Sequence, residues 1–249
     1  MRLSPRLSGR SFITLYALLE ESLILAVKRE KIMLPIILSD YPEIALNETP
    51  RGYEIKDNKN NMKMTLSLDD YKRIISENKK HQLSKILKST GLNILDCTGG
   101  FARDAAILTS LGNKVTLIEQ NPLIMSLLIN AKMNIKNEKI KSIFESMQTR
   151  LGNCIDFIRN TNARFDYIYF DFMFNNKKSS LPSKKEQFLR KIVKTDIREN
   201  LDIVRETLIR VSNKIIIKEH ISSNDYRDFD IINTYKGKTV KYHLLKGKK

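Results

Sequence analysis

The sequence predicts an α/β fold built on a doubly wound, mostly parallel sheet, with a small α+β region ahead of it. From residue 68 onward, short apolar segments alternate with longer segments of helical periodicity, which is typical of parallel sheets. Gly99 and Gly100 follow the first of these apolar segments, and Pro122 stands where a helix of the alternation begins. The length of 249 residues suits one large domain with a small appendage.

The small N-terminal region is expected to cover residues 1–65. Its apolar stretch over 12–38 is interrupted by charged side chains, which are costly in a bilayer, namely Glu20, Glu21, Lys28, Arg29, Glu30 and Lys31. We therefore expect a helix followed by a strand over 32–38, and no membrane span. Residues 47–62 are rich in Asn, Lys and Glu and predict an exposed loop or an irregular hairpin. The main domain then begins near Leu66 and covers 66–249.

The main domain begins with a polar, basic segment whose apolar residues recur at mostly helical spacing until Gly91 ends the helix. Strands are predicted where apolar and β-branched residues cluster, and helices where the spacing lengthens. The predicted helices cover 71–89, 103–111, 122–134, 151–160, 184–194 and 199–211. The predicted strands cover 93–97, 114–119, 142–147, 167–170, 214–218 and 239–245, and the last is expected at an edge of the sheet.

Composition narrows the classes of function. A net charge of +16 favours a polyanionic partner such as nucleic acid, although Lys, Asn and Ile are abundant throughout and an AT-rich coding sequence would also produce a basic surface. Cys97 and Cys154 lie far apart in the sequence and form no zinc-ligand cluster, which fits a reduced, cytoplasmic protein. The three histidines stand alone, so we expect neither a metal site nor a Ser/His/Asp triad.

The segment from Asp96 to Asp104 lies where a predicted strand ends and a helix begins. Its Thr98, Gly99 and Gly100 let the backbone approach a ligand, and the following helix start offers unpaired N–H donors. Such a turn can hold a dinucleotide or the methionine and ribose portions of S-adenosylmethionine. Because the full GxGxxG spacing is absent, the dinucleotide interpretation is weaker.

Glu119 ends the next predicted strand, twenty residues beyond Gly99. An acidic side chain at this place can accept both hydroxyls of an adenosine ribose. The alternative is a surface glutamate at a strand end. Together with the glycine turn, Glu119 favours a nucleotide-like ligand.

Asp171 opens an aromatic loop, Asp171-Phe172-Met173-Phe174, directly after the apolar strand 167–170. This pattern is similar to the Asp-Pro-Pro-Tyr type of loop in enzymes that methylate exocyclic amines of bases. An acceptor on the N–H bonds of such an amine, with an aromatic face that stacks on the base, would serve that reaction, so Asp171, Phe172 and Phe174 are the candidate catalytic residues. Alternatively, the aromatic residues are simply core. The segment that follows is basic, and its lysines would bind RNA phosphates, namely Lys177, Lys178, Lys184 and Lys185. The alternative is a solvated surface loop.

Together, residues 96–121 and the loop from 169 to 185 resemble the bacterial ribosomal RNA small subunit methyltransferase J family. The resemblance implies a Rossmann-like class I methyltransferase that transfers methyl from S-adenosylmethionine to the N2 amine of a guanosine in small-subunit ribosomal RNA. We also expect a cytoplasmic, monomeric protein whose partner is that RNA or the small ribosomal subunit. The implied cofactor contacts are Arg103, Asp104, Glu119, Gln120, Asn153, Cys154 and Asp171, beside Asp96, Thr98, Gly99 and Gly100 of the turn.

This chain departs from the family pattern at several places. Family members usually carry Gly at the place of Ala102, Pro at Phe172 and Asn175, and a serine pair at Asn153 and Cys154. Alternatives within the same fold are a methyltransferase for adenine N6 in DNA or RNA and a non-catalytic RNA-binding module. An NAD dehydrogenase fits least, because no candidate acid or base for hydride transfer accompanies the turn. All the methyltransferase hypotheses require that the carboxylates of Glu119 and Asp171 face one cleft roofed by the turn at 98–102.

Overall fold

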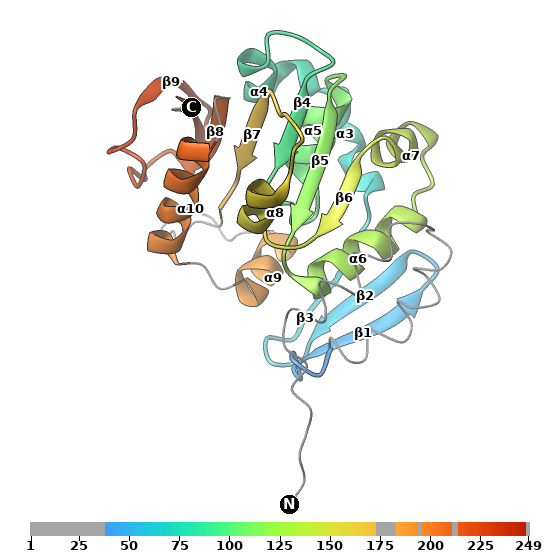
Figure 1. The fold of residues 1–249 in the computed structure, drawn as a ribbon. Coiled ribbons are helices and arrows are strands. Elements are labelled where there is room, and N and C mark those ends of the chain that lie inside the picture. The colour runs from blue at the N-terminus through green and yellow to red at the C-terminus, as the bar shows by residue number, and fades with distance from the viewer. Residues whose placement is uncertain (1–37, 173–182, 194–195, 211–213, 248–249) are drawn as a thin grey trace, which may run out of the picture.

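The computed structural model describes residues 38–172, 183–193, 196–210 and 214–247, which fold into two sheets with helices around them (Figure 1). The expected N-terminal helix and the strand over 32–38 lie outside the described residues, apart from Leu38. Within the described part of the chain, no helix is long and apolar enough to cross a membrane.

The larger sheet has seven strands in the order β6-β5-β4-β7-β8-β10-β9. Its parallel part consists of β4 (Asn93–Asp96), β5 (Lys114–Glu119), β6 (Gln148–Leu151), β7 (Tyr167–Phe170) and β8 (Lys214–His220). The antiparallel strands β9 (Ile231–Lys236) and β10 (Val240–Lys246) complete it. The α/β class with a doubly wound, mostly parallel sheet is therefore confirmed.

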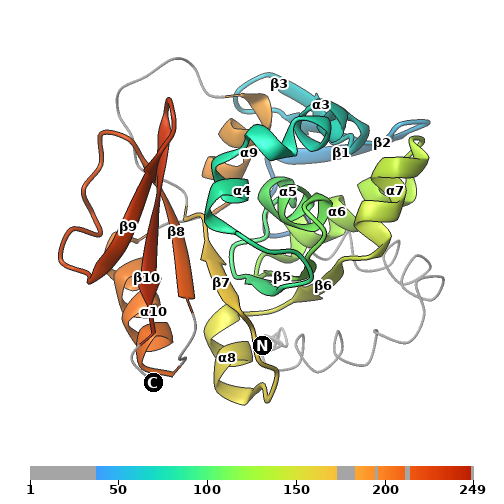
Figure 2. The same cartoon turned by 90° about the horizontal axis from the view of Figure 1, so that it is seen from above.

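Helices cover both faces of this sheet, as Figure 2 shows. On one face α8 (Cys154–Asn160) and α10 (Ile197–Arg210) pack over strand residues such as Leu95 and Ile168. On the other, the main elements are α5 (Arg103–Ser110), α6 (Pro122–Met133), α7 (Glu138–Glu145) and α9 (Lys184–Ile192). Consecutive strand residues such as Ile94 and Leu95 thus enter opposite cores, because side chains alternate along a strand.

The smaller sheet is a regular antiparallel meander of β1 (Ile44–Thr49), β2 (Gly52–Asp57) and β3 (Met62–Thr65). Of the two alternatives predicted for 47–62, the hairpin is present and the loop is not, and the strands pair in a regular antiparallel register instead of an irregular one. The backbone N–H of Tyr53 donates to the Asn130 side chain of α6 at 3.1 Å, which ties the small sheet to the main domain. Ile55 belongs to the same buried cluster as α6. The division at Leu66 into two domains stays a prediction.

The helix predicted over 71–89 is broken into short pieces: η1 (Asp69–Tyr71), α3 (Lys72–Ser76), η2 (Asn78–Lys80) and α4 (Gln82–Ile86). The Asn78 side chain leaves the helical pattern to donate to the carbonyl O of Ser110 at 2.8 Å. His81 then adopts an extended backbone and caps α4. Polar contacts with α5 outweigh the helical periodicity here.

The strand predicted over 142–147 was also wrong, because most of this segment belongs to helix α7. Asn137 caps that helix, and Ile140 and Phe144, four residues apart, are its buried side chains. The strand expected near this place is β6, which begins only at Gln148.

At the C-terminus, the segment predicted as an edge strand forms β10, which lies between β8 and β9. The true edge strand, β9, has the burial pattern of a half-exposed strand and was not predicted. The other predicted elements are present with end shifts of a few residues: α8 begins at Cys154 instead of residue 151, because Asn153 caps it.

Candidate active site

The turn after β4 packs tightly on the neighbouring strand β5. The Gly99 N–H donates to the carbonyl O of Ile118 at 2.9 Å, and a Cβ on Gly99 would lie 2.5 Å from Cδ2 of Leu117. Only glycine fits there without a shift of its neighbours. Ala102, which caps α5, has a φ of +58°, a left-handed conformation that favours glycine. This backbone explains why glycine would suit that position.

Glu119 joins the end of β5 to this turn. Its carboxylate accepts the backbone N–H of Gly100 at 2.7 Å through Oε2 and that of Asn121 at 2.7 Å through Oε1. Burial raises the pKa of the Glu119 carboxyl, and the hydrogen bonds from Asn121 and Gly100 counteract this effect. Glu119 and the glycine turn are therefore in direct contact, as the sequence predicted.

Asp96, at the end of β4, links the turn to β7. Its Oδ1 accepts the Thr98 backbone N–H at 3.0 Å, and the Thr98 hydroxyl accepts the Asp171 N–H at 2.6 Å. Burial raises the pKa of Asp96 to about 8. The chain of contacts from Asp96 through Thr98 to Asp171 brings two strand ends together at the carboxyl edge of the sheet.

Lys218, on β8, was missed by the sequence analysis. Its Nζ lies 2.6 Å from Oδ2 of Asp171 and 2.8 Å from Oδ2 of Asp104, so one ammonium group bridges two carboxylates. Tyr169 also donates to Oδ2 of Asp104, at 2.5 Å. Since a lysine inside an apolar strand pattern is ordinarily an edge or surface residue, only pairing in space could reveal this one.

The ion cluster shifts the ionisation of its members in opposite directions. Burial raises the pKa of Asp171 to about 6, while the Lys218 charge counteracts that shift. The pKa of Asp104 is lowered: burial alone would raise it, but the Lys218 charge and hydrogen bond prevail. Asp104 is 6% exposed, and its Oδ1 has no hydrogen-bond partner among the described residues. A buried acceptor without a donor is suited to an N–H group of a ligand.

Gln120, Asn153 and Cys154 lie at the ends of β5 and β6, next to the same site. Asn153 caps α8 through the Ile155 N–H at 2.8 Å, and its amide donates to the Gln120 side chain at 3.5 Å. Cys154 is buried, and burial together with the hydrogen bond between the two thiols raises the pKa of Cys97. The predicted cofactor residues thus line one edge of the sheet, from β6 to β7.

The remaining predicted residues divide into three groups. Phe172 is 8% exposed and stacks on Phe170 with ring centroids 5.0 Å apart, so little of its ring is open to a base. Arg103 and Lys184 are exposed, whereas Lys185 is engaged with Asp70 at 2.9 Å and lies over the ring of Tyr71. Phe174, Lys177 and Lys178 lie outside the described residues.

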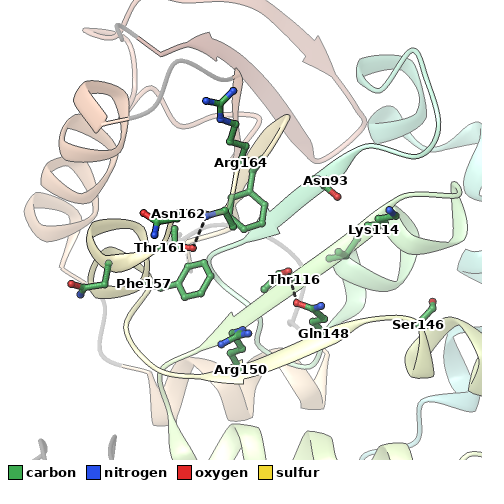
Figure 3. A pocket seen from close by; sticks show the side chains of 14 residues that line it. Asn93, Lys114, Thr116, Ser146, Gln148, Arg150, Phe157, Thr161, Asn162 and Arg164 are labelled. Atoms are coloured by element: carbon green, nitrogen blue, oxygen red, sulfur yellow. Dashed lines mark hydrogen bonds between the residues drawn. The ribbon is translucent and has the colours of Figure 1, made fainter. Parts of the chain in front are cut away.

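A separate hollow of about 800 Å³ lies at the opposite edge of the sheet, where β4, β5 and β6 begin (Figure 3). Asn93, Lys114 and Gln148 line it, and these residues start the three strands that Asp96, Glu119 and Leu151 end. It is therefore distinct from the cluster around Asp171.

Known proteins resemble this chain over most of its length. The family model described as "Putative SAM-dependent methyltransferase" matches residues 30–246. Ribosomal RNA small subunit methyltransferase J of Aeromonas salmonicida is 29% identical over 191 residues, which cover 72% of this chain and 76% of the relative. The protein of that name from Buchnera aphidicola is 29% identical over 230 residues, 82% of this chain and 87% of the relative.

Among solved structures, a SAM-dependent methyltransferase from Neisseria gonorrhoeae has a TM-score of 0.61 and 15% identity, with 80% of each chain covered. This likeness concerns the fold. The sheet, its flanking helices and the family match define a Rossmann-like enzyme whose cofactor is S-adenosylmethionine. The chain belongs to the ribosomal RNA small subunit methyltransferase J family of methyltransferases, as the resemblance implied.

Proposed function

We propose that this enzyme transfers the methyl group of S-adenosylmethionine to the N2 amine of a guanosine in small-subunit ribosomal RNA. The observation that carries the proposal is the position of Asp171 at the carboxyl edge of the sheet, beside the glycine turn. Its backbone N–H donates to the Thr98 hydroxyl, and its carboxylate accepts from the Lys218 ammonium. The names of the relatives support the choice of substrate. A monomer that acts in the cytoplasm, on free RNA or on the small subunit, is part of the same proposal.

The residues of this edge fit the cofactor. Gly99 leaves no room for a side chain under the turn, and the Asp104 Oδ1 is a buried acceptor without a partner in the described structure. Asp96, Thr98, Gly100, Arg103, Glu119, Gln120, Asn153 and Cys154 would complete the binding site around them. When bound, S-adenosylmethionine supplies an activated methyl group on a sulfonium, which is a good leaving group.

Asp171 would accept an N–H of the target amine and so favour a nitrogen whose lone pair is free to form the new N–C bond. Because its pKa is about 6, the carboxylate is ionised at neutral pH and can take the proton that the amine must lose. Lys218 keeps that carboxylate in place. Phe174 and the lysines at 177, 178, 184 and 185 are proposed to contact the base and the RNA backbone.

The test is methyl transfer to purified small-subunit ribosomal RNA from cells that lack the gene, with the product located by mass mapping. One new methylguanosine is expected, whereas large-subunit RNA and DNA should receive no methyl group. Methylated adenine in either nucleic acid would favour the N6 alternative. Tight RNA binding without S-adenosylmethionine affinity in calorimetry would favour a non-catalytic module.

A further inference from the structure

The cluster of Lys218, Asp104 and Asp171 combines three charged groups on three different elements. Lys218 comes from β8, Asp104 from α5, and Asp171 directly follows β7. The Lys218 side chain is 12% exposed and that of Asp104 6%, so both charges are largely removed from water. Such an arrangement is stable only if the charges compensate each other.

Two neighbouring carboxylates repel each other, and the proximity of Asp104 raises the pKa of Asp171. The Lys218 ammonium opposes this effect from 2.6 Å, and the two carboxylates together raise its own pKa. Tyr169 also touches the cluster, through the hydroxyl that donates to Oδ2 of Asp104. The other ionisable groups around the cluster are more distant, namely His81, Asp96, Arg103, Glu119, Tyr226 and Tyr242. Lys218 is the cation in direct contact with both carboxylates.

We propose that Lys218 is a positioning residue for methyl transfer, which holds the Asp171 carboxylate ionised and oriented toward the target amine. This inference rests on the proposed function. Its physical basis is geometric: the contacts at 2.6 and 2.8 Å fix the carboxylates of Asp171 and Asp104 relative to each other. Lys218 need not touch either substrate.

The test compares Lys218→Met with the wild type over a range of pH. Removing the ammonium should lower kcat by about 10- to 100-fold, as loss of an electrostatic group near a reacting centre does. Because Lys218 lowers the pKa of Asp171, its loss should move the acid limb of the kcat profile to higher pH, by about 1 or more. Lys218→Arg keeps the charge and should restore the acid limb.

Lys191→Met is the matched control. Lys191 also bridges two carboxylates, those of Asp57 at 2.6 Å and Glu43 at 3.5 Å, but it joins α9 to the small sheet. The Lys191→Met variant should therefore leave the acid limb of the kcat profile unchanged. Lys218→Gln, which retains hydrogen-bond donors without charge, replaces the Met variant if the latter does not fold, as judged by thermal unfolding.

An unchanged acid limb and kcat in the neutral Lys218 variant would overturn the inference, as would the same shift in Lys191→Met. Failure of the proposed function is recognised separately, because the wild type itself would then not methylate small-subunit RNA. In that case the pH profile of transfer to whichever nucleic acid is methylated still reports on Lys218.

A second observation, independent of the cluster, concerns the hollow in Figure 3. Its cations are Lys114, Arg150 and Arg164, and none of its lining residues is acidic. The other side chains are mostly amides, hydroxyls and two phenylalanines, of which Phe157 lies under the Arg150 guanidinium at 5.5 Å. The nearby carboxylate of Asp166, next to the lining residue Phe165, accepts the backbone N–H of Asn93 at 2.8 Å. Cations and amides without carboxylates suit a polyanion.

The geometry points to a contact for the phosphate backbone of the substrate RNA at this hollow, remote from the target nucleotide. Lys114 is the first residue of β5 and Glu119 the last, so the two edges of the sheet are five strand steps apart, or about 17 Å. A stacked nucleic-acid strand with the rise of roughly 3.4 Å per step known from double-stranded DNA covers that distance in about five steps. One folded RNA can therefore reach both edges of the sheet, which deepens the proposed function.

The test measures binding of a small-subunit RNA transcript at several salt concentrations. Lys114→Gln with Arg164→Gln removes two exposed cations of the hollow, and Lys72→Gln with Arg198→Gln removes two exposed cations elsewhere. The first pair should weaken binding about tenfold and reduce the salt slope by about 1.4, which corresponds to two lost phosphate contacts. Equal effects of both pairs, or no effect of the first, would overturn this contact. Methyl transfer by the wild type to the same transcript tests the proposed function separately.

Discussion

Asp171 is the residue on which the proposed chemistry depends most directly. Asp171→Asn keeps the shape of the side chain but removes the charge that accepts the amine N–H and its proton. We expect kcat to fall by about 100- to 1,000-fold, a larger loss than that of S-adenosylmethionine affinity, which Asp171 shares with the other cofactor residues. Single-turnover kinetics and calorimetry measure the two quantities. Turnover close to wild type would show that another group accepts the proton.

The pKa of Asp171, raised to about 6, predicts the pH dependence of the reaction. The carboxylate is protonated below this value and ionised above it, so kcat should fall as the pH drops through about 6 and level off toward neutrality. The profile of kcat against pH measures this. The acid limb should be absent from the residual activity of Asp171→Asn, and its persistence there would assign it to a different group.

Glu119 stabilises the glycine turn and is also proposed to bind the cofactor. Glu119→Ala leaves the N–H groups of Gly100 and Asn121 without their acceptor, so it should reduce cofactor affinity and the free energy of unfolding, each by about 1 to 3 kcal/mol. Glu119→Gln retains one acceptor oxygen and should lose less. Calorimetry and denaturant unfolding separate the two effects, and unchanged affinity in both variants would place the ribose elsewhere.

At the scale of elements, the glycine turn and β5 are packed as one unit. Gly99→Ala places a methyl group against Leu117, which should destabilise the fold by about 1 to 3 kcal/mol and weaken the cofactor site. Leu117→Val in the same chain shortens the side chain in contact and should recover part of the loss. Denaturant unfolding of both single variants and the double variant forms the test, and strict additivity would contradict a direct contact.

Helical periodicity was a good guide where one face of a helix meets one core, and a poor guide elsewhere. The predicted helices at 103–111 and 122–134 correspond to α5 and α6, which bury apolar faces under the sheet. The segment at 71–89 has similar spacing, yet the contact of Asn78 with Ser110 and the extended backbone of His81 divide it. Such polar contacts between distant segments leave no local pattern.

At the scale of the whole molecule, the small sheet shares its core with the main domain. Ile44, Ile55 and Met64 belong to one buried cluster with residues of α6. A chain of residues 66–249 would expose that apolar surface to water, so it should unfold at a lower temperature than the full protein and bind apolar dyes. Calorimetric unfolding of both chains measures this, and equal melting temperatures would instead support an independent main domain.

The alternation of apolar strands and periodic helices, the glycines of the turn after β4, and the acidic residues at the end of β5 and after β7 were all apparent along the chain. They suffice for the parallel part of the sheet, the turn and the proposed place of the cofactor site, because parallel strands bring their carboxyl ends to one edge. The bridging by Lys218, the burial of Phe172, the insertion of β10 between β8 and β9, and the sharing of one core by both sheets came only from the folded molecule. Each depends on contacts between residues far apart in the chain, where burial and charge pairing outweigh local preference.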